Sequence, residues 1–88
     1  MHTEKQIEDW LASETREVVL ADGSRRPVRM FRLSWETYDC LVALSGYTPE
    51  QIAGWALEES CLQKLSFGEA FEGVVAWLDH QRRERWGV

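Results

Sequence analysis

Arginine side chains gather in one short stretch of the chain, and they are its clearest candidates for chemistry. Four of them, Arg25, Arg26, Arg29 and Arg32, fall within eight residues. Guanidinium groups bind phosphate, and at a base edge they donate paired hydrogen bonds to guanine. The chain as a whole has a net charge of −5, so distant carboxylates weaken the attraction of this patch for an anion. The sequence thus predicts a local anion-binding stretch on an acidic molecule.

The side chains needed for catalysis or for metal binding do not gather in this sequence. The histidines are His2, near the N-terminus, and His80, in a late helical turn beside Asp79. Nucleophilic catalysis requires a nucleophile, a base and an orienting group in one place, and no spacing suggests such a set. Glu58 and Glu59 are adjacent, so on a helix they point about 100° apart and fit a solvated face. We therefore expect that the protein is not an enzyme and that it has neither a cofactor nor a metal site.

The cysteines bear on the compartment of the protein. Cys40 and Cys61 belong to neither a CxxC motif nor a metal-ligand spacing, and both fall in helical patterns. Buried free thiols in a reducing cytoplasm are the expected state. The first residues do not resemble a signal peptide and no apolar run has membrane-spanning length, so we expect a cytoplasmic protein.

The stretch 26–35, which carries three of the arginines, is predicted to be a strand that runs directly into a helix. Strand side chains alternate between two faces. One face then holds Phe31 and Leu33, which we expect to be buried. The other face holds a set that we expect to be exposed: Val28, Met30, Arg32 and Ser34.

Asp22-Gly23 precedes this stretch and is a strong two-residue hairpin signal. The hairpin or ribbon is predicted at 16–33. Its return strand has two possible partners, the preceding strand of the same chain or its own copy in a second molecule.

Helical periodicity and capping residues predict four helices around this ribbon, all in one domain covering 1–88. The predicted ranges are 3–13, 34–45, 48–62 and 66–85. Their expected N-caps are Thr3, Ser34, Thr48 and Ser66. The fold class is therefore mainly α with a short hairpin. Gly54 lies inside a predicted helix, where glycine costs about 1 kcal/mol relative to alanine, so we expect it to serve close packing.

Tryptophan is abundant for a chain of this size. The 88 residues include five tryptophans and are 44% hydrophobic, more apolar surface than a small single core easily buries. Trp10, Trp35, Trp55 and Trp77 fall in or beside apolar stripes, so we expect them in the core or in a dimer interface. Trp86 lies in the basic tail, where it either contacts a partner or folds back.

The junction Phe31-Arg-Leu-Ser-Trp35, an amphipathic helix, and Gly46-Tyr-Thr-Pro-Glu50 opening a second helix resemble the ribbon-helix-helix superfamily of the Arc and MetJ repressors. The resemblance covers roughly residues 26–80, and the added third helix looks like a bacterial subgroup with a C-terminal extension. It implies a homodimer whose two strands pair and whose outward side chains enter the DNA major groove.

The resemblance also implies roles for individual residues. Met30, Arg32 and Ser34 would point into the groove, and Thr48, at a helix N-terminus, would hold a phosphate with help from Arg29. The shared dimer core would contain Phe31, Leu33, Trp35, Ile52 and Trp55. Met30 cannot hydrogen bond to a base, and Glu50 in the first turn opposes a phosphate.

Two functions follow from these expectations. The first is a dimeric DNA-binding protein, a transcriptional regulator or an antitoxin-like repressor, with Arg32 reading a base. The alternative is a protein-interaction module, or an acidic inhibitor or adaptor, that keeps the dimer fold but does not bind DNA.

Overall fold

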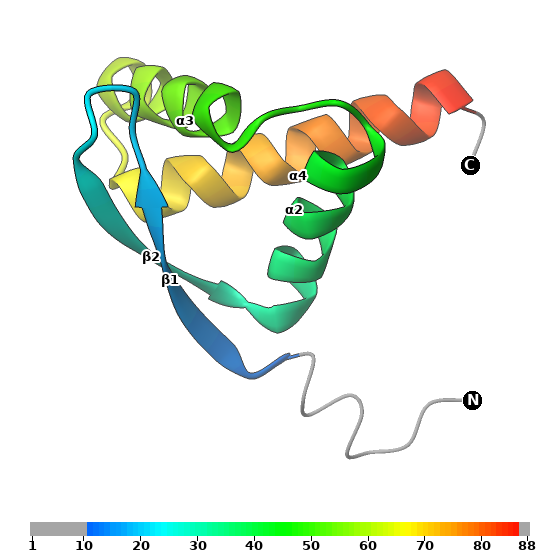
Figure 1. Ribbon diagram of the computed structural model, residues 1–88, viewed down its shortest axis with the longest axis horizontal. Coiled ribbons are helices and arrows are strands. Elements are labelled where there is room, and N and C mark those ends of the chain that lie inside the picture. The colour runs from blue at the N-terminus through cyan, green and yellow to red at the C-terminus, as the bar shows by residue number, and fades with distance from the viewer. Residues whose placement is uncertain (1–10, 87–88) are drawn as a thin grey trace.

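The computed structural model describes residues 11–86 of the chain as a two-stranded antiparallel hairpin followed by three helices (Figure 1). The elements follow in the order β1 (Ser13–Val19), β2 (Arg25–Phe31), α2 (Arg32–Leu44), α3 (Pro49–Gln63) and α4 (Phe67–Trp86). The predicted mainly-α fold class with a short hairpin is confirmed. The helix predicted at 3–13 lies outside the described residues up to position 10; at its described end Leu11 is helical, whereas Ser13 is already the first residue of β1.

The hairpin forms within one chain, so the preceding strand is one partner of the return strand, and pairing of the return strand with its copy in a second molecule stays a prediction. β1 and β2 pair in antiparallel register, with Arg16 opposite Val28. The loop is longer than the predicted two-residue turn. Within it only Gly23 takes a positive φ, of 86°, and the Gly23 N–H donates to the Leu20 carbonyl oxygen at 2.9 Å. This is a three-residue loop with glycine at its left-handed position. The Asp22 carboxylate accepts hydrogen bonds from Ser24, which hold the loop closed.

The predicted faces of the β2 strand are reversed. Val28 and Met30 are buried, with Met30 only 1% exposed, whereas Phe31 is 47% exposed. The predicted alternation of side chains between the two faces is correct. The helices cover the face that holds Val28 and Met30, and Val18 of β1 belongs to the same buried cluster. Leu33 does not belong to the strand at all, because the helix begins at Arg32.

The helix α2 starts two residues earlier than its predicted cap. Ser34 is therefore not an N-cap; Phe31 holds that position and has no side-chain cap. The reason lies in the hairpin, because the backbone N–H of Arg32 donates to the Ala12 carbonyl oxygen at 2.9 Å. A first-turn N–H that a helix normally leaves without a partner is thus satisfied by Ala12, the residue that precedes β1.

The other two helices begin where the sequence predicts. Thr48 and Gln51 form a capping box at the start of α3, with both hydrogen bonds present. Ser66 and Glu69 form the corresponding pair before α4. These pairs depend on residues three positions apart, so the local sequence is sufficient to define them. Gly46, with φ of 77°, ends α2 as predicted.

The long helix α4 is the element around which the others pack (Figure 1). It contacts α3, α2 and β2. Phe71 lies at the centre of these contacts, with its ring centroid 5.8 Å from that of Trp35 and 5.4 Å from that of Tyr38. The core thus sits between α4 and the inner face of the hairpin.

Two further expectations from the sequence, on Gly54 and on the burial of the cysteines, fail within the described residues. Gly54 is exposed, and a Cβ atom built there would meet no heavy atom within 4 Å in the described chain, so it serves no close packing within it. Cys40 and Cys61 are free, as expected, but exposed rather than buried. Among the described helices, none combines the length and the apolar character needed to cross a membrane.

Candidate functional site

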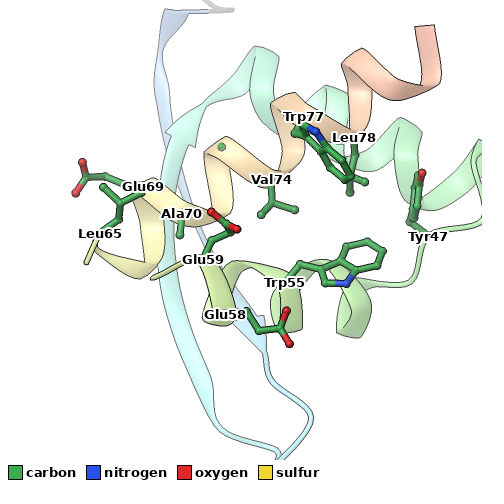
Figure 2. A pocket seen from close by; sticks show the side chains of 11 residues that line it. Tyr47, Trp55, Glu58, Glu59, Leu65, Glu69, Ala70, Val74, Trp77 and Leu78 are labelled. Carbon is green, nitrogen blue, oxygen red and sulfur yellow. The ribbon is translucent and has the colours of Figure 1, made fainter. Parts of the chain in front are cut away.

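An open apolar groove lies between α3 and α4, with a cavity volume of about 630 Å³ (Figure 2). Tyr47 and Leu65, from the segments that flank α3, contribute to its two ends, and α3 itself supplies Trp55, Glu58 and Glu59. We call this site the α3–α4 groove.

One long stripe of α4 forms the other side of the groove. Its residues recur at helical spacing along the stripe, as Glu69, Ala70, Gly73, Val74, Trp77 and Leu78. Ala70, Val74 and Leu78 are buried and also belong to the apolar core. Trp77 is 58% exposed. The groove is therefore a continuation of the core surface that α2, α3 and α4 leave uncovered.

Aromatic side chains gather at one end of the groove. Trp55 and Trp77 face it from opposite helices (Figure 2). The rings of Tyr47 and Trp55 meet edge to face, with centroids 5.9 Å apart. Trp55 is 37% exposed, so neither tryptophan is buried in the core of the single chain. Of the two locations expected for Trp77, the core of the single chain is wrong, because Trp77 lies just beside the buried stripe of α4, and a dimer interface stays a prediction.

Carboxylates make the groove acidic. Three of its lining residues are glutamates, Glu58, Glu59 and Glu69, and none is basic. Glu69 also completes the cap of α4, where its carboxylate accepts a hydrogen bond from the Ser66 hydroxyl at 2.9 Å. Glu58 and Glu59 form no salt bridge within residues 11–86. Their charges are therefore available to a ligand.

The strand–helix junction (Glu14, Arg16, Trp35, Tyr38 and Asp39) has the opposite character. The indole N–H of Trp35 donates to the Glu14 carbonyl oxygen at 2.8 Å, and the Arg16 guanidinium lies 4.7 Å from the Trp35 ring centroid. Arg16 also pairs with Asp39 at 2.9 Å and with Glu14 at 2.6 Å. The hydrogen bond to Asp39 is the main cause that raises the pKa of Arg16. Within this cluster, the Trp35 indole N–H and the Arg16 guanidinium thus have partners from the same chain.

The structure separates the residues that were expected to contact DNA. Met30 is buried in the core, so its predicted outward position is wrong. Arg29 does lie on the uncovered face of β2, opposite Thr15. Of these two residues, only Arg29 is therefore exposed on the outward face of the ribbon.

Three other residues expected at DNA lie at helix starts. Arg32 and Ser34 belong to the first turn of α2, and Arg32 already approaches the Glu14 carboxylate at 3.8 Å. Thr48 is the N-cap of α3, where its hydroxyl and its N–H are both engaged with Gln51. Arg32, which was expected to read a base, and Thr48, which was expected to hold a phosphate, therefore already have partners within the chain.

The predicted dimer core divides into two sets. Trp35 and Ile52 are buried within the single chain and need no partner for their burial. Phe31 and Leu33 are about half exposed, and Trp55 lines the groove. The structure describes one chain, so pairing of two copies stays a prediction.

Comparisons of the chain with protein-family models, with curated proteins and with solved structures found no match. The resemblance to ribbon-helix-helix proteins therefore stays a prediction. Within residues 11–86, no cluster of three potential metal-ligating side chains was found either. The α3–α4 groove is the candidate site that rests on geometry.

One feature of the sequence pointed toward the groove, namely the position of Trp77 outside the apolar stripe that the sequence predicts for α4. Trp77 lies at the edge of the stripe through Ala70, Val74 and Leu78, and two glutamates, Glu58 and Glu59, follow Trp55 on the facing helix. A tryptophan at the edge of an apolar stripe, facing carboxylates, fits a groove as well as a core. Only the packing of α3 against α4 shows that Trp77 lines a groove.

Proposed function

We propose that the chain is a protein-interaction module that holds a segment of a partner protein in the α3–α4 groove. One observation carries this proposal: Trp55 and Trp77 face the same groove while remaining accessible to water. Exposed tryptophans beside an apolar cavity are typical of binding surfaces, and tryptophan is enriched among residues that dominate interface energies.

The geometry supports this function better than DNA binding. A ribbon that reads DNA needs its outward side chains free, but Met30 is buried and Arg32 and Ser34 belong to a helix. The net charge of −5 also opposes a polyanion. The remaining exposed arginine face includes Arg25, which is paired with Glu17 at 3.4 Å.

A displayed library of random peptides tests the proposal. We expect the wild-type chain to enrich a peptide motif and Trp77→Ser to lose it. Leu44→Ser is the control, because Leu44 is a strongly exposed apolar residue of α2 outside the groove. Failure to enrich any peptide in a Trp77-dependent way would overturn the proposal.

Duplex DNA provides the second arm of this experiment. We expect the wild-type chain to show no binding in anisotropy titrations at low salt, where attraction to phosphates is strongest. Binding that Arg29→Ala or Arg32→Ala weakens would instead favour the DNA-reading ribbon.

A further inference from the structure

We propose that the occupant of the α3–α4 groove is a basic amphipathic helix of another protein. This inference rests on the proposed function, and it adds the charge and the secondary structure of the bound segment.

Charge selects a basic partner. The groove has three glutamates and no lysine or arginine among its lining residues, and two of them, Glu58 and Glu59, have no salt-bridge partner within residues 11–86. Carboxylates beside an apolar surface attract a cation more strongly than they would in bulk water. A lysine or arginine next to the apolar anchor of a ligand would meet these charges at the rim.

The same argument disfavours occupants from this protein itself. Residues 1–10 contain one lysine and three acidic residues, and a second copy of the chain has a net charge of −5. Residues 1–10 would bring further negative charge to the rim, and a second copy would approach against the repulsion of a like net charge. A segment of a different, basic protein is the complementary occupant.

The arrangement of the lining residues favours a helical ligand. On α4 they extend from Glu69 to Leu78, which corresponds to roughly 14 Å along a helix axis. Two or three turns of a ligand helix match this length, and a helix that binds in a groove uses anchors at i, i+3 or i+4, and i+7. Gly73 lies within the stripe, and a Cβ atom built there would meet nothing within 4 Å, so a ligand helix has room at this point.

The two ends of the groove differ, and the difference orients the ligand. Tyr47, Trp55 and Trp77 surround the aromatic end, whereas Leu65 and Glu69 lie at the other end (Figure 2). A bulky apolar anchor of the ligand fits the aromatic end. Its basic residues, one or two turns away, then lie toward the glutamates.

Designed peptides labelled with a fluorophore test the proposal on the full-length chain. Three peptides of roughly 15 residues, a length at which helices begin to form, share one apolar face. The first has lysines and arginines on its flanks, the second has glutamates there, and the third is the basic peptide with a central proline, which breaks a helix. Anisotropy titrations should show binding of the first peptide alone, with an affinity that falls as salt is raised.

A pair of double variants isolates the rim charges from the overall field. Glu58→Gln with Glu59→Gln should weaken binding of the basic peptide by about three- to tenfold, as expected for the loss of exposed ion pairs. Glu36→Gln with Glu72→Gln removes the same charge from exposed positions of α2 and α4 outside the groove, and should leave binding unchanged.

The outcomes separate this inference from the proposed function. Equal binding by both double variants, or equal binding of the acidic peptide, would overturn the basic partner. Undiminished binding of the proline-containing peptide would overturn the helical ligand. If the peptide library meanwhile enriches a motif that depends on Trp77, the interaction module stands without this inference; if no peptide depends on Trp77, both proposals fail.

Discussion

Trp35 and Trp77 are the same residue type on helices of one small fold, yet they lie in opposite surroundings. At the strand–helix junction, Trp35 is buried against Phe71 and its N–H is hydrogen bonded. At the α3–α4 groove, Trp77 is more than half exposed and the neighbouring glutamates Glu58 and Glu59 have no salt bridge within residues 11–86. The Trp35 indole N–H and the Arg16 guanidinium find partners within one chain, whereas Trp77, Glu58 and Glu59 stay exposed at the groove, although Val74 and Leu78 beside them belong to the core.

The largest expected difference between the two regions is in stability. Trp35→Ala should lower the free energy of unfolding by about 3–5 kcal/mol, because it leaves a cavity beside Phe71. Trp77→Ala should change it by about 0.5 kcal/mol or less, as for most surface substitutions. Denaturant unfolding followed by circular dichroism measures both without depending on tryptophan fluorescence. Similar losses would mean that the groove is part of the core.

Trp35→Phe sharpens this test by keeping a ring in place while removing the indole N–H. The Glu14 carbonyl oxygen then loses the indole donor, which should cost about 0.5–1.5 kcal/mol, the net value of one hydrogen bond. A neutral effect would show that the hydrogen bond at the junction is exposed to solvent.

The hairpin gives the next largest contrast, between its two faces. Met30→Ala should cost about 2–5 kcal/mol because the side chain is fully buried. Phe31→Ala should cost much less in dilute protein, since the ring is half exposed. Denaturant melts at several protein concentrations measure this. A Phe31→Ala cost that grows with concentration would support pairing of two copies through this face, because dimer stability depends on concentration.

The ribbon and the caps show which features a sequence can define. The capping boxes of Thr48 with Gln51 and Ser66 with Glu69 are correct because each is complete within four residues. The strand alternation around Met30 was also visible, but which of its two faces is buried depends on where the distant helix α4 packs. Periodicity alone contains no information on that choice.

The start of α2 and the groove were missed for the same physical reason. Ser34 is a good cap by local rules, but the hairpin already supplies a partner for the Arg32 N–H, so the helix begins earlier. The apolar character of Trp77 predicts the core or a dimer interface, but it does not determine how exposed the side chain is in one chain. In both places a contact between segments far apart in sequence decides the outcome.

Glycine substitutions should give smaller effects and again distinguish the groove. Gly54→Ala should stabilise the chain by about 0.5–1 kcal/mol, because Gly54 lies in a helix with free space around its missing Cβ. Gly73→Ala should stabilise the chain by a similar amount, which thermal or denaturant melts measure. The substitution also adds a methyl group inside the groove. Gly73→Ala should therefore weaken binding of the basic peptide while Gly54→Ala leaves it unchanged. Loss of stability in Gly54→Ala would indicate a packing contact that one chain does not contain.

The smallest effect concerns pH and tests how closed the junction is. Burial, and then the charges of Asp39 and Glu50, raise the pKa of Tyr38 above its ordinary value, against an opposing effect of Arg16. Once the pH passes about 10, the unfolded chain loses this phenolic proton before the folded chain does. The unfolded state then binds fewer protons, so stability falls as pH rises, whereas below this range Tyr38 contributes no pH dependence.

Tyr38→Phe isolates this contribution, because every other titrating group is common to both proteins. Chemical denaturation between about pH 8 and pH 11 should show a steeper loss of stability for the wild type than for Tyr38→Phe. Because the phenol is half-buried, the difference should be modest and absent near neutral pH. Parallel curves would mean that water reaches the Tyr38 hydroxyl freely. The junction would then be open to solvent at Tyr38. The burial of the Trp35 ring would remain as the difference between the junction and the α3–α4 groove.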